Sequence, residues 1–133
     1  MDALELANSF RGVRGRSVDA LDPALGLHEL RETIRGLFAA AADGSRPDRA
    51  AVAKLNHLAR APQLEWPRSP RLARETPESE AARTAIELLA SGRIRRCANP
   101  RCIRFLGDES RRIFCSEACA NRTRVARHAA RSA

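Results

Sequence analysis

The sequence predicts a mainly α fold, with a small helical N-terminal domain at residues 1–90 and a short C-terminal unit at residues 91–133. Three observations support this division. Apolar residues before residue 90 recur at helical spacing, in segments that open with capping residues and close with glycine or proline. All four cysteines lie within residues 97–119. Basic and acidic residues balance before residue 91, so the net charge of +8 belongs entirely to the C-terminal unit.

The first predicted elements are a short helix over residues 3–10 and a polar, glycine-containing loop over residues 11–19. Asp22 followed by proline is typical of a helix N-cap and first turn, and Asp43-Gly44 is a typical helix stop. The helix between them has one apolar face, made of Leu27, Leu30, Ile34, Leu37, Phe38 and Ala41.

A second helix is predicted to start at Asp48 and to end before the prolines of residues 62–72. That proline-rich segment has room for a short strand ending at Trp66, whose side chain we expect to be buried in the core or between domains. Thr76 followed by proline predicts the start of a third helix, and Gly92 predicts its end.

The cysteine spacing is Cys97-x4-Cys102-x12-Cys115-x3-Cys119. Two close pairs separated by about a dozen residues are typical of a structural zinc site. The chain opens with no basic and apolar leader segment, which favours a reducing cytoplasm and disfavours disulfides. A redox or iron–sulfur role and a catalytic zinc remain as alternatives, although neither gap is the C-x-x-C of thiol oxidoreductases. His128 is an alternative ligand to one of the cysteines.

The local sequence predicts how the two pairs are presented. Asn99-Pro100 favours a tight turn inside the first pair. Residues 103–105 and 113–114 are expected to pair as strands around a turn at Gly107-Asp108, and Ser116 is expected to cap a helix. A knuckle, a hairpin and a helix in this order describe a treble-clef zinc finger. Its few apolar residues cannot stabilise it alone, so one structural zinc ion is the expected cofactor.

This segment resembles a known family, the CGNR zinc finger, through Phe105, Asp108, Ser110, Arg111-Arg112-x-Phe114-Cys115-Ser116 and Cys119-Ala120-Asn121-Arg122. Ala120 replaces the glycine that names the motif. Residues 3–12, 28–44 and 50–62 resemble the ABATE domain that accompanies this finger in bacteria. The resemblance implies a stress-induced transcriptional regulator that binds DNA.

The arginines after Cys119 point to the same partner. In helical steps of 100°, Arg124, Arg127 and Arg131 share one face, with Arg122 to one side and Val125 turned towards the hairpin. Arg111 and Arg112 are expected to extend this surface. Contact with duplex DNA is favoured, because no aromatic residues alternate with the arginines as single-strand stacking requires. The alternative is a protein–protein adaptor with a solvated basic face.

Two polar residues are expected to support the metal site, Asp108 and Asn121, although Asn121 has the chemistry to read an adenine edge instead. Arg96 and Arg101 are candidates for neutralising the thiolates. No catalytic residues are assigned, and we expect the protein not to be an enzyme. The sequence has no apolar run long enough for a membrane span. A homodimer and a small-molecule effector of the N-terminal domain are compatible with it.

Overall fold

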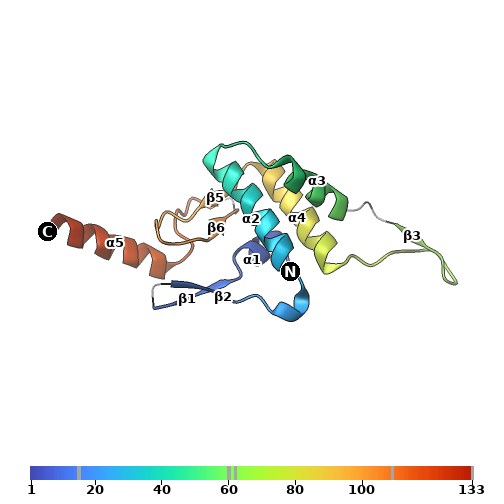
Figure 1. Ribbon diagram of the computed structural model, residues 1–133, viewed down its shortest axis with the longest axis horizontal. Coiled ribbons are helices and arrows are strands. Elements are labelled where there is room, and N and C mark those ends of the chain that lie inside the picture. The colour runs from blue at the N-terminus through green and yellow to red at the C-terminus, as the bar shows by residue number, and fades with distance from the viewer. Residues whose placement is uncertain (15, 60, 62, 109, 133) are drawn as a thin grey trace.

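The computed structural model describes residues 1–14, 16–59, 61, 63–108 and 110–132. These form a mainly α protein with short antiparallel strand pairs, which confirms the predicted fold class (Figure 1). The helices are α1 (Ala3–Ala7), α2 (His28–Asp43), α3 (Arg49–Leu58), α4 (Pro77–Ser91) and α5 (Glu117–Ser132), with a 3-10 turn η1 (Pro23–Leu25). The strands are β1 (Phe10–Val13) with β2 (Arg16–Asp19), β3 (Leu64–Glu65) with β4 (Arg71–Leu72), and β5 (Arg95–Arg96) with β6 (Phe105–Leu106). Gly15 of the predicted loop and Pro62 of the predicted break lie outside the described residues.

Most of the predicted helix ends are confirmed. The side chain of Asp48 accepts a hydrogen bond from the Ala50 N–H at 3.0 Å and caps α3. Gly44 and Gly92 close α2 and α4 in the left-handed conformation, which glycine adopts without steric cost. The predicted start of α2 at Asp22-Pro23 is wrong, because those residues open only η1 before a left-handed Gly26 ends that turn.

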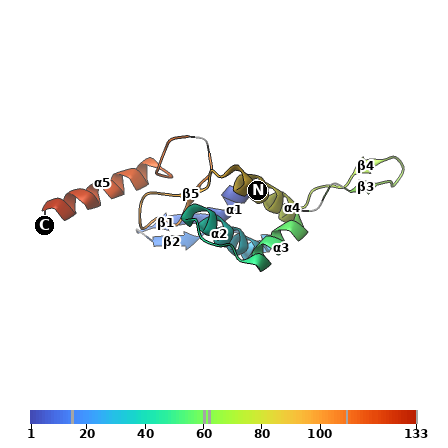
Figure 2. The ribbon, with the colours of Figure 1, turned by 90° about the horizontal axis from the view of Figure 1, so that it is seen from above.

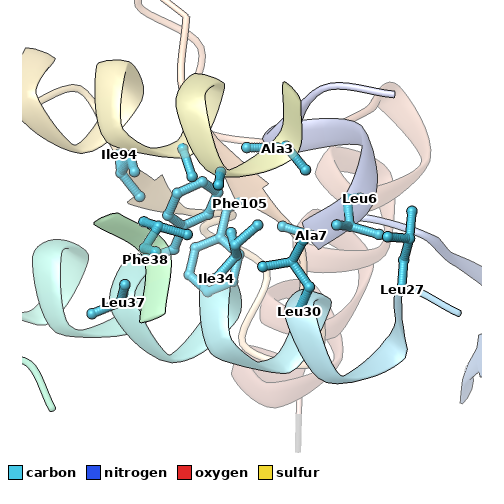
Figure 3. Packing of buried hydrophobic residues seen from close by; sticks show 14 of the residues in the cluster. Ala3, Leu6, Ala7, Leu27, Leu30, Ile34, Leu37, Phe38, Ile94 and Phe105 are labelled. Carbon is cyan, nitrogen blue, oxygen red and sulfur yellow. The ribbon is translucent and has the colours of Figure 1, made fainter. Parts of the chain in front are cut away.

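A single hydrophobic core joins the two predicted domains. Figure 3 shows Ile94 and Phe105 of the C-terminal unit among the apolar side chains of α1 and α2. The rings of Phe105 and Phe38 meet edge-to-face with their centroids 5.7 Å apart, a favoured geometry for aromatic pairs. The C-terminal unit therefore contributes its largest buried side chain to the helical part, and its position relative to α2 is fixed by packing.

Asn8 joins the same two parts through hydrogen bonds. Its side-chain Nδ2 donates to the Phe105 carbonyl at 2.9 Å, and its Oδ1 accepts from the Phe105 N–H at 2.8 Å. The carboxamide thus pairs with β6 as a neighbouring strand would. This satisfies both backbone groups of a residue that is almost completely buried.

Arg35 of α2 is a half-buried guanidinium at the junction. It donates hydrogen bonds to the carbonyls of Ala7 at 2.7 Å and Ile103 at 2.8 Å. It also lies 5.0 Å from the ring centroids of both Phe10 and Phe105. Burial lowers the pKa of Arg35 from its ordinary value, and this cost is offset by the two carbonyls and the two aromatic faces.

Residues 10–13 and 16–19 pair as the β1–β2 hairpin, so the loop predicted for residues 11–19 is wrong. Four residue pairs are in register, from Phe10 opposite Asp19 to Val13 opposite Arg16. The hairpin lacks the apolar alternation by which a half-buried strand is recognised. Its base, at Phe10 and Asp19, is instead held by Arg31 and Arg104, which come from distant segments, so the local sequence does not reveal the hairpin.

The strand pairing predicted inside the finger is also wrong. β6 pairs with β5, which precedes the first cysteine, and residues 113–114 belong to no strand. Residues 113–114 instead approach the first cysteine pair through an isolated backbone hydrogen bond, in which the Ala98 N–H donates to the Ile113 carbonyl at 2.8 Å. The Ile113 side chain is exposed, so burial does not favour a strand at this position.

Two elements project from opposite ends of the core: α5 at one end and the β3–β4 hairpin at the other (Figures 1 and 2). Trp66 lies in the β3–β4 hairpin and is 68% exposed, so the prediction that it is buried is wrong. Leu64 and Leu72 of the same hairpin are also exposed. The hairpin is closed by its own ladder and by an Arg71–Glu65 ion pair.

Candidate metal centre

The first cysteine pair lies in a tight turn that follows β5. The Cys102 N–H donates to the Asn99 carbonyl at 2.9 Å, and the Arg101 N–H donates to the Asn99 side-chain oxygen at 3.1 Å. An asparagine that hydrogen-bonds the backbone two residues ahead stabilises such turns. The turn predicted at Asn99-Pro100 is therefore confirmed, and it brings Cys97 and Cys102 round to the same side.

The second pair lies where α5 begins. The Ser116 hydroxyl accepts from the Cys119 N–H at 3.2 Å, which confirms Ser116 as the helix cap and places Cys119 in the first turn. The Cys115 N–H donates to the Cys97 sulfur at 3.3 Å and so links this pair to the first. An N–H···S bond of this kind stabilises a thiolate, the form of cysteine that binds metals.

The four thiols converge on one point. All their sulfur atoms lie within 4.8 Å of one another, and Cys115 lies 3.7 Å from Cys102 and 3.5 Å from Cys119. These distances are near the roughly 3.8 Å that separates the sulfurs of a tetrahedral zinc–thiolate site. They far exceed the about 2.05 Å of a disulfide, and all four cysteines are free. The arrangement fits one zinc ion in a closed site with no open position for substrate.

The electrostatics of the cluster favour a bound cation. Burial raises the pKa of Cys102 and Cys115, so these thiols resist ionisation on their own. Burial also opposes ionisation of Cys119, but hydrogen bonds led by that from the Asn99 side chain lower its pKa to about 7. A divalent ion supplies the positive charge that lets all four sulfurs be thiolates, and structural zinc contributes about 10–16 kcal/mol in small fingers.

The sequence matches two protein-family models that together span residues 18–132. The first is ABATE, described as "Putative stress-induced transcription regulator", and it matches residues 18–92. The second is the CGNR zinc finger, which matches residues 93–132. The chain belongs to the ABATE family. A search of curated proteins found no significant match. The CGNR finger of this ABATE protein, with its four converging thiols, holds one structural zinc ion.

Three further predictions concern membrane spans, the domain boundary and His128. No helix of the described residues combines the length and apolar character needed to cross a bilayer. The division of the chain at residues 90 and 91 stays a prediction, as does the treble-clef assignment. His128 is exposed on α5 and is not among the four converging ligands.

The asparagine beside the sulfur cluster is Asn99, not Asn121. Asn99 is buried and its Nδ2 lies 3.5 Å from the Cys119 sulfur. Asn121 is exposed on α5, where its side-chain oxygen accepts from Arg124 at 2.5 Å. From the sequence, Asn99 was predicted only as a turn residue. The position of an asparagine between two cysteines does not reveal whether its side chain also donates a hydrogen bond to sulfur.

Asp108 organises the loop that leads to the second cysteine pair. Its carboxylate accepts from Ser110 at 2.7 Å, from Arg95 at 3.1 Å and from Arg112 at 2.8 Å. These contacts, led by the Ser110 hydroxyl, lower the pKa of Asp108. Its support for the metal site is therefore indirect, through the path of the loop.

The arginines expected to neutralise the thiolates have other roles in the ABATE protein. Arg96 forms a bidentate ion pair with Asp43 of α2, at 2.8 and 2.9 Å. Arg101 is exposed.

The basic residues after the last cysteine lie on a free helix. Thr123 is buried, and its hydroxyl donates to the Cys119 carbonyl at 3.0 Å. Every described residue of α5 beyond it is exposed, including Val125, so the prediction that Val125 turns towards the hairpin is wrong. Within the described chain, no ion pair or hydrogen bond engages the side chains of Arg111, Arg122, Arg127 and Arg131. Arg112 is held by Asp108, as described above.

Proposed function

We propose that this ABATE protein is a bacterial, zinc-dependent transcriptional regulator that binds duplex DNA through α5. The observation that carries the proposal is the free basic helix. After Thr123, every described residue of α5 is exposed, and Arg124, Arg127 and Arg131 recur on one face. A helical segment that is exposed on every side gains little from packing on its own protein, so an external anionic partner explains its length and charge.

The dimensions of α5 suit a duplex. At 1.5 Å per residue, its 16 residues extend about 24 Å. The major groove of B-form DNA admits an α-helix, and arginine fits phosphate by bidentate hydrogen bonds. The first turn of α5 is fixed by the zinc site through Cys119, so loss of the metal would release the helix from its orientation.

The proposed role is binding and not catalysis, since the thiols leave no open metal position for a reactant. A reducing bacterial cytoplasm suits both free thiols and access to the chromosome. A homodimer would use the β3–β4 hairpin, where the side chains of Leu64, Trp66 and Leu72 are exposed. A small-molecule effector would fit the mainly apolar pocket of about 330 Å³ between α2, α3 and α4. The second candidate function, a protein–protein adaptor, would use α5 to bind an acidic partner.

The test is duplex binding as a function of salt. Wild-type protein should bind a pool of random duplexes with log affinity falling linearly against log salt, at about −0.9 per phosphate contacted. A variant with Arg124→Gln, Arg127→Gln and Arg131→Gln should lose up to about 2.7 from that slope. The matched control removes three exposed arginines elsewhere, Arg46→Gln, Arg68→Gln and Arg74→Gln.

The control variant should bind as wild type does, because its three arginines lie outside α5. The control and α5 variants have the same net charge, so a difference between them reports only where the charge is lost. Equal affinity in the α5 variant and in wild type would contradict DNA binding through α5 and favour the adaptor. Sequencing the bound duplexes from the same experiment reports any sequence preference.

A further inference from the structure

The β3–β4 hairpin has one apolar face. Leu64 lies opposite Leu72 in the ladder, so both side chains point to the same side. Trp66 follows Leu64 by two residues, and the alternation of an extended chain directs its side chain to that side as well. The other face carries the Glu65–Arg71 ion pair. The apolar face lies at the opposite end of the molecule from α5 (Figures 1 and 2).

This apolar face is open to solvent in the single chain. Leu64 and Leu72 are each 67% exposed and Trp66 is 68% exposed. Contiguous exposed apolar side chains mark interaction sites, and a two-stranded ribbon gains stability when its apolar face packs against another surface. Tryptophan is enriched among the residues that dominate binding energy at interfaces, where it fills a pocket of the partner. The hairpin therefore has the chemistry of an interface element.

The same chain has an apolar pocket of matching size. The pocket has a volume of about 330 Å³ and lies between α2, α3 and α4. Its lining is apolar apart from two polar residues, and it includes Leu37, Leu55, Ile86 and Leu89. This volume is at the lower end for pockets that hold small organic ligands, a scale that suits an indole ring. Ser45 also lines the pocket, and its hydroxyl can accept the hydrogen bond that a buried indole N–H requires.

The hairpin and the pocket of one chain are separated. The hairpin precedes Pro77, the first residue of α4, whereas the pocket includes Ile86, which lies about 14 Å further along that helix at 1.5 Å per residue. The hairpin also extends away from the helices (Figure 1). A second copy of the chain can bring a hairpin and a pocket into contact.

The area available suits a dimer in which this contact is made twice. Three side chains that are each two-thirds exposed offer roughly 400 Å², since one large aromatic residue alone buries about 150–250 Å². Mutual exchange covers two hairpin faces and two pocket surfaces, a total of roughly 1,600 Å², which is the standard size of a stable interface. Two-fold exchange also uses every hairpin and every pocket, so the assembly closes at two chains.

We infer that the protein forms a two-fold homodimer in which the β3–β4 hairpin of each chain inserts Trp66 into the pocket between α2, α3 and α4 of the other chain. The inference gives the homodimer of the proposed function its contact surfaces, and it does not depend on DNA binding. A small-molecule effector in the same pocket would compete with the hairpin, so it would act by separating the two chains.

Trp66 is the one tryptophan of the chain, so its fluorescence reports whether the hairpin is buried. As the concentration of zinc-loaded, full-length protein rises without DNA, sedimentation should show the mass of one chain giving way to that of two. The emission should shift to shorter wavelength over the same range. Ala41→Glu, at an exposed pocket position of α2, should raise the dissociation constant of the dimer at least about tenfold. Val125→Ser removes an equally exposed apolar side chain from α5 and is the matched control, which should dimerise as wild type does.

A mixing experiment tests the contact itself. A hairpin variant with Trp66→Ser and Leu72→Ser has an intact pocket and no tryptophan. Added to Ala41→Glu, which keeps its hairpin, it should restore one hairpin–pocket contact and shift the emission to shorter wavelength. All of that emission comes from Trp66 of the Ala41→Glu chain, so the shift would place this side chain in the pocket of the hairpin variant.

Two results would overturn the inference. One is a wild-type protein that stays monomeric at about 100 μM with the emission of an exposed tryptophan. The other is an Ala41→Glu variant that dimerises and shifts its emission as wild type does, because the hairpins would then pair with each other. Both results leave the proposed function standing, since α5 is not part of the contact. Val52→Glu, in the same pocket, replaces Ala41→Glu if circular dichroism shows that the latter does not fold.

Discussion

Asn8 and Phe105 lie 97 residues apart, yet the carboxamide of one exchanges two hydrogen bonds with the backbone of the other. Asn8 ends α1, and Phe105 begins the second strand of the finger. Their pairing connects the helical part to the zinc-binding part at the point where Phe105 enters the shared core. The two parts are therefore expected to unfold together.

Asn8→Ala removes this connection. The buried N–H and carbonyl of Phe105 would lose their partners, and we expect the free energy of unfolding to fall by about 1–3 kcal/mol. Urea denaturation followed by circular dichroism measures it. Asn56→Ala, at an exposed position of α3, is the matched control and should stay within about 0.5 kcal/mol of wild type. Equal effects of the two substitutions would show that the Asn8–Phe105 pair does not hold the parts together.

Arg35→Met keeps the length of the side chain but removes the guanidinium. The carbonyls of Ala7 and Ile103 would lose their donor, and we expect a loss of about 1–3 kcal/mol in the free energy of unfolding. Arg35→Lys should not restore it fully, since an ammonium lacks the planar fork and the stacking on Phe10 and Phe105. Arg49→Met on the exposed side of α3 is the control. An Arg35→Lys variant with the free energy of unfolding of wild type would contradict the role proposed for the planar guanidinium.

Zinc removal should destabilise the helical part as well as the finger. Phe105 and Ile94 leave the shared core if the finger loses its fold, and loss of a buried Phe contact costs about 3–5 kcal/mol. Hydrogen exchange of the amides in α2 and α4, with and without chelator under reducing conditions, measures this. Unchanged protection of α2 and α4 after chelation would mean that the finger unfolds as an independent domain.

The features that the sequence predicted correctly depend on neighbours in the chain. The caps at Asp48 and Thr76, the stop at Gly44 and the turn at Asn99 each act within a few residues. Each cysteine pair also depends on a local feature, the turn at Asn99 or the cap at Ser116, and the spacing of the pairs predicted that they share one metal.

The features that the sequence missed are held by distant partners. The β1–β2 hairpin depends on Arg31 and Arg104, which contact Phe10 and Asp19 from other segments. The β5–β6 pair is two residues long, too short for any alternation to reveal it. Trp66 was expected to be buried because large aromatic residues usually are, but it lies in the β3–β4 hairpin, which projects from the core.

Acid should weaken the attachment of the hairpin. The Arg31 guanidinium and the Leu21 N–H hold the pKa of Asp19 well below its ordinary value near 4. A carboxyl whose pKa is lowered by folding contributes stability that is complete above its unfolded pKa and is lost as pH falls towards the folded value. Below about pH 4, the urea midpoint of wild type should therefore fall more steeply than that of Asp19→Asn.

Both proteins share the acid sensitivity of the thiol cluster, so the difference between them isolates Asp19. Parallel pH profiles for wild type and Asp19→Asn would contradict the Asp19–Arg31 attachment.

The most direct test of the account is the metal content of the full-length protein purified under reducing conditions. Elemental analysis should find one zinc ion per chain, and Cys102→Ser, which removes one of the four converging thiols, should bind zinc far more weakly and lose the folded finger. A wild-type protein that is folded and holds no stoichiometric metal would contradict the claim that one ion joins both cysteine pairs and orients α5.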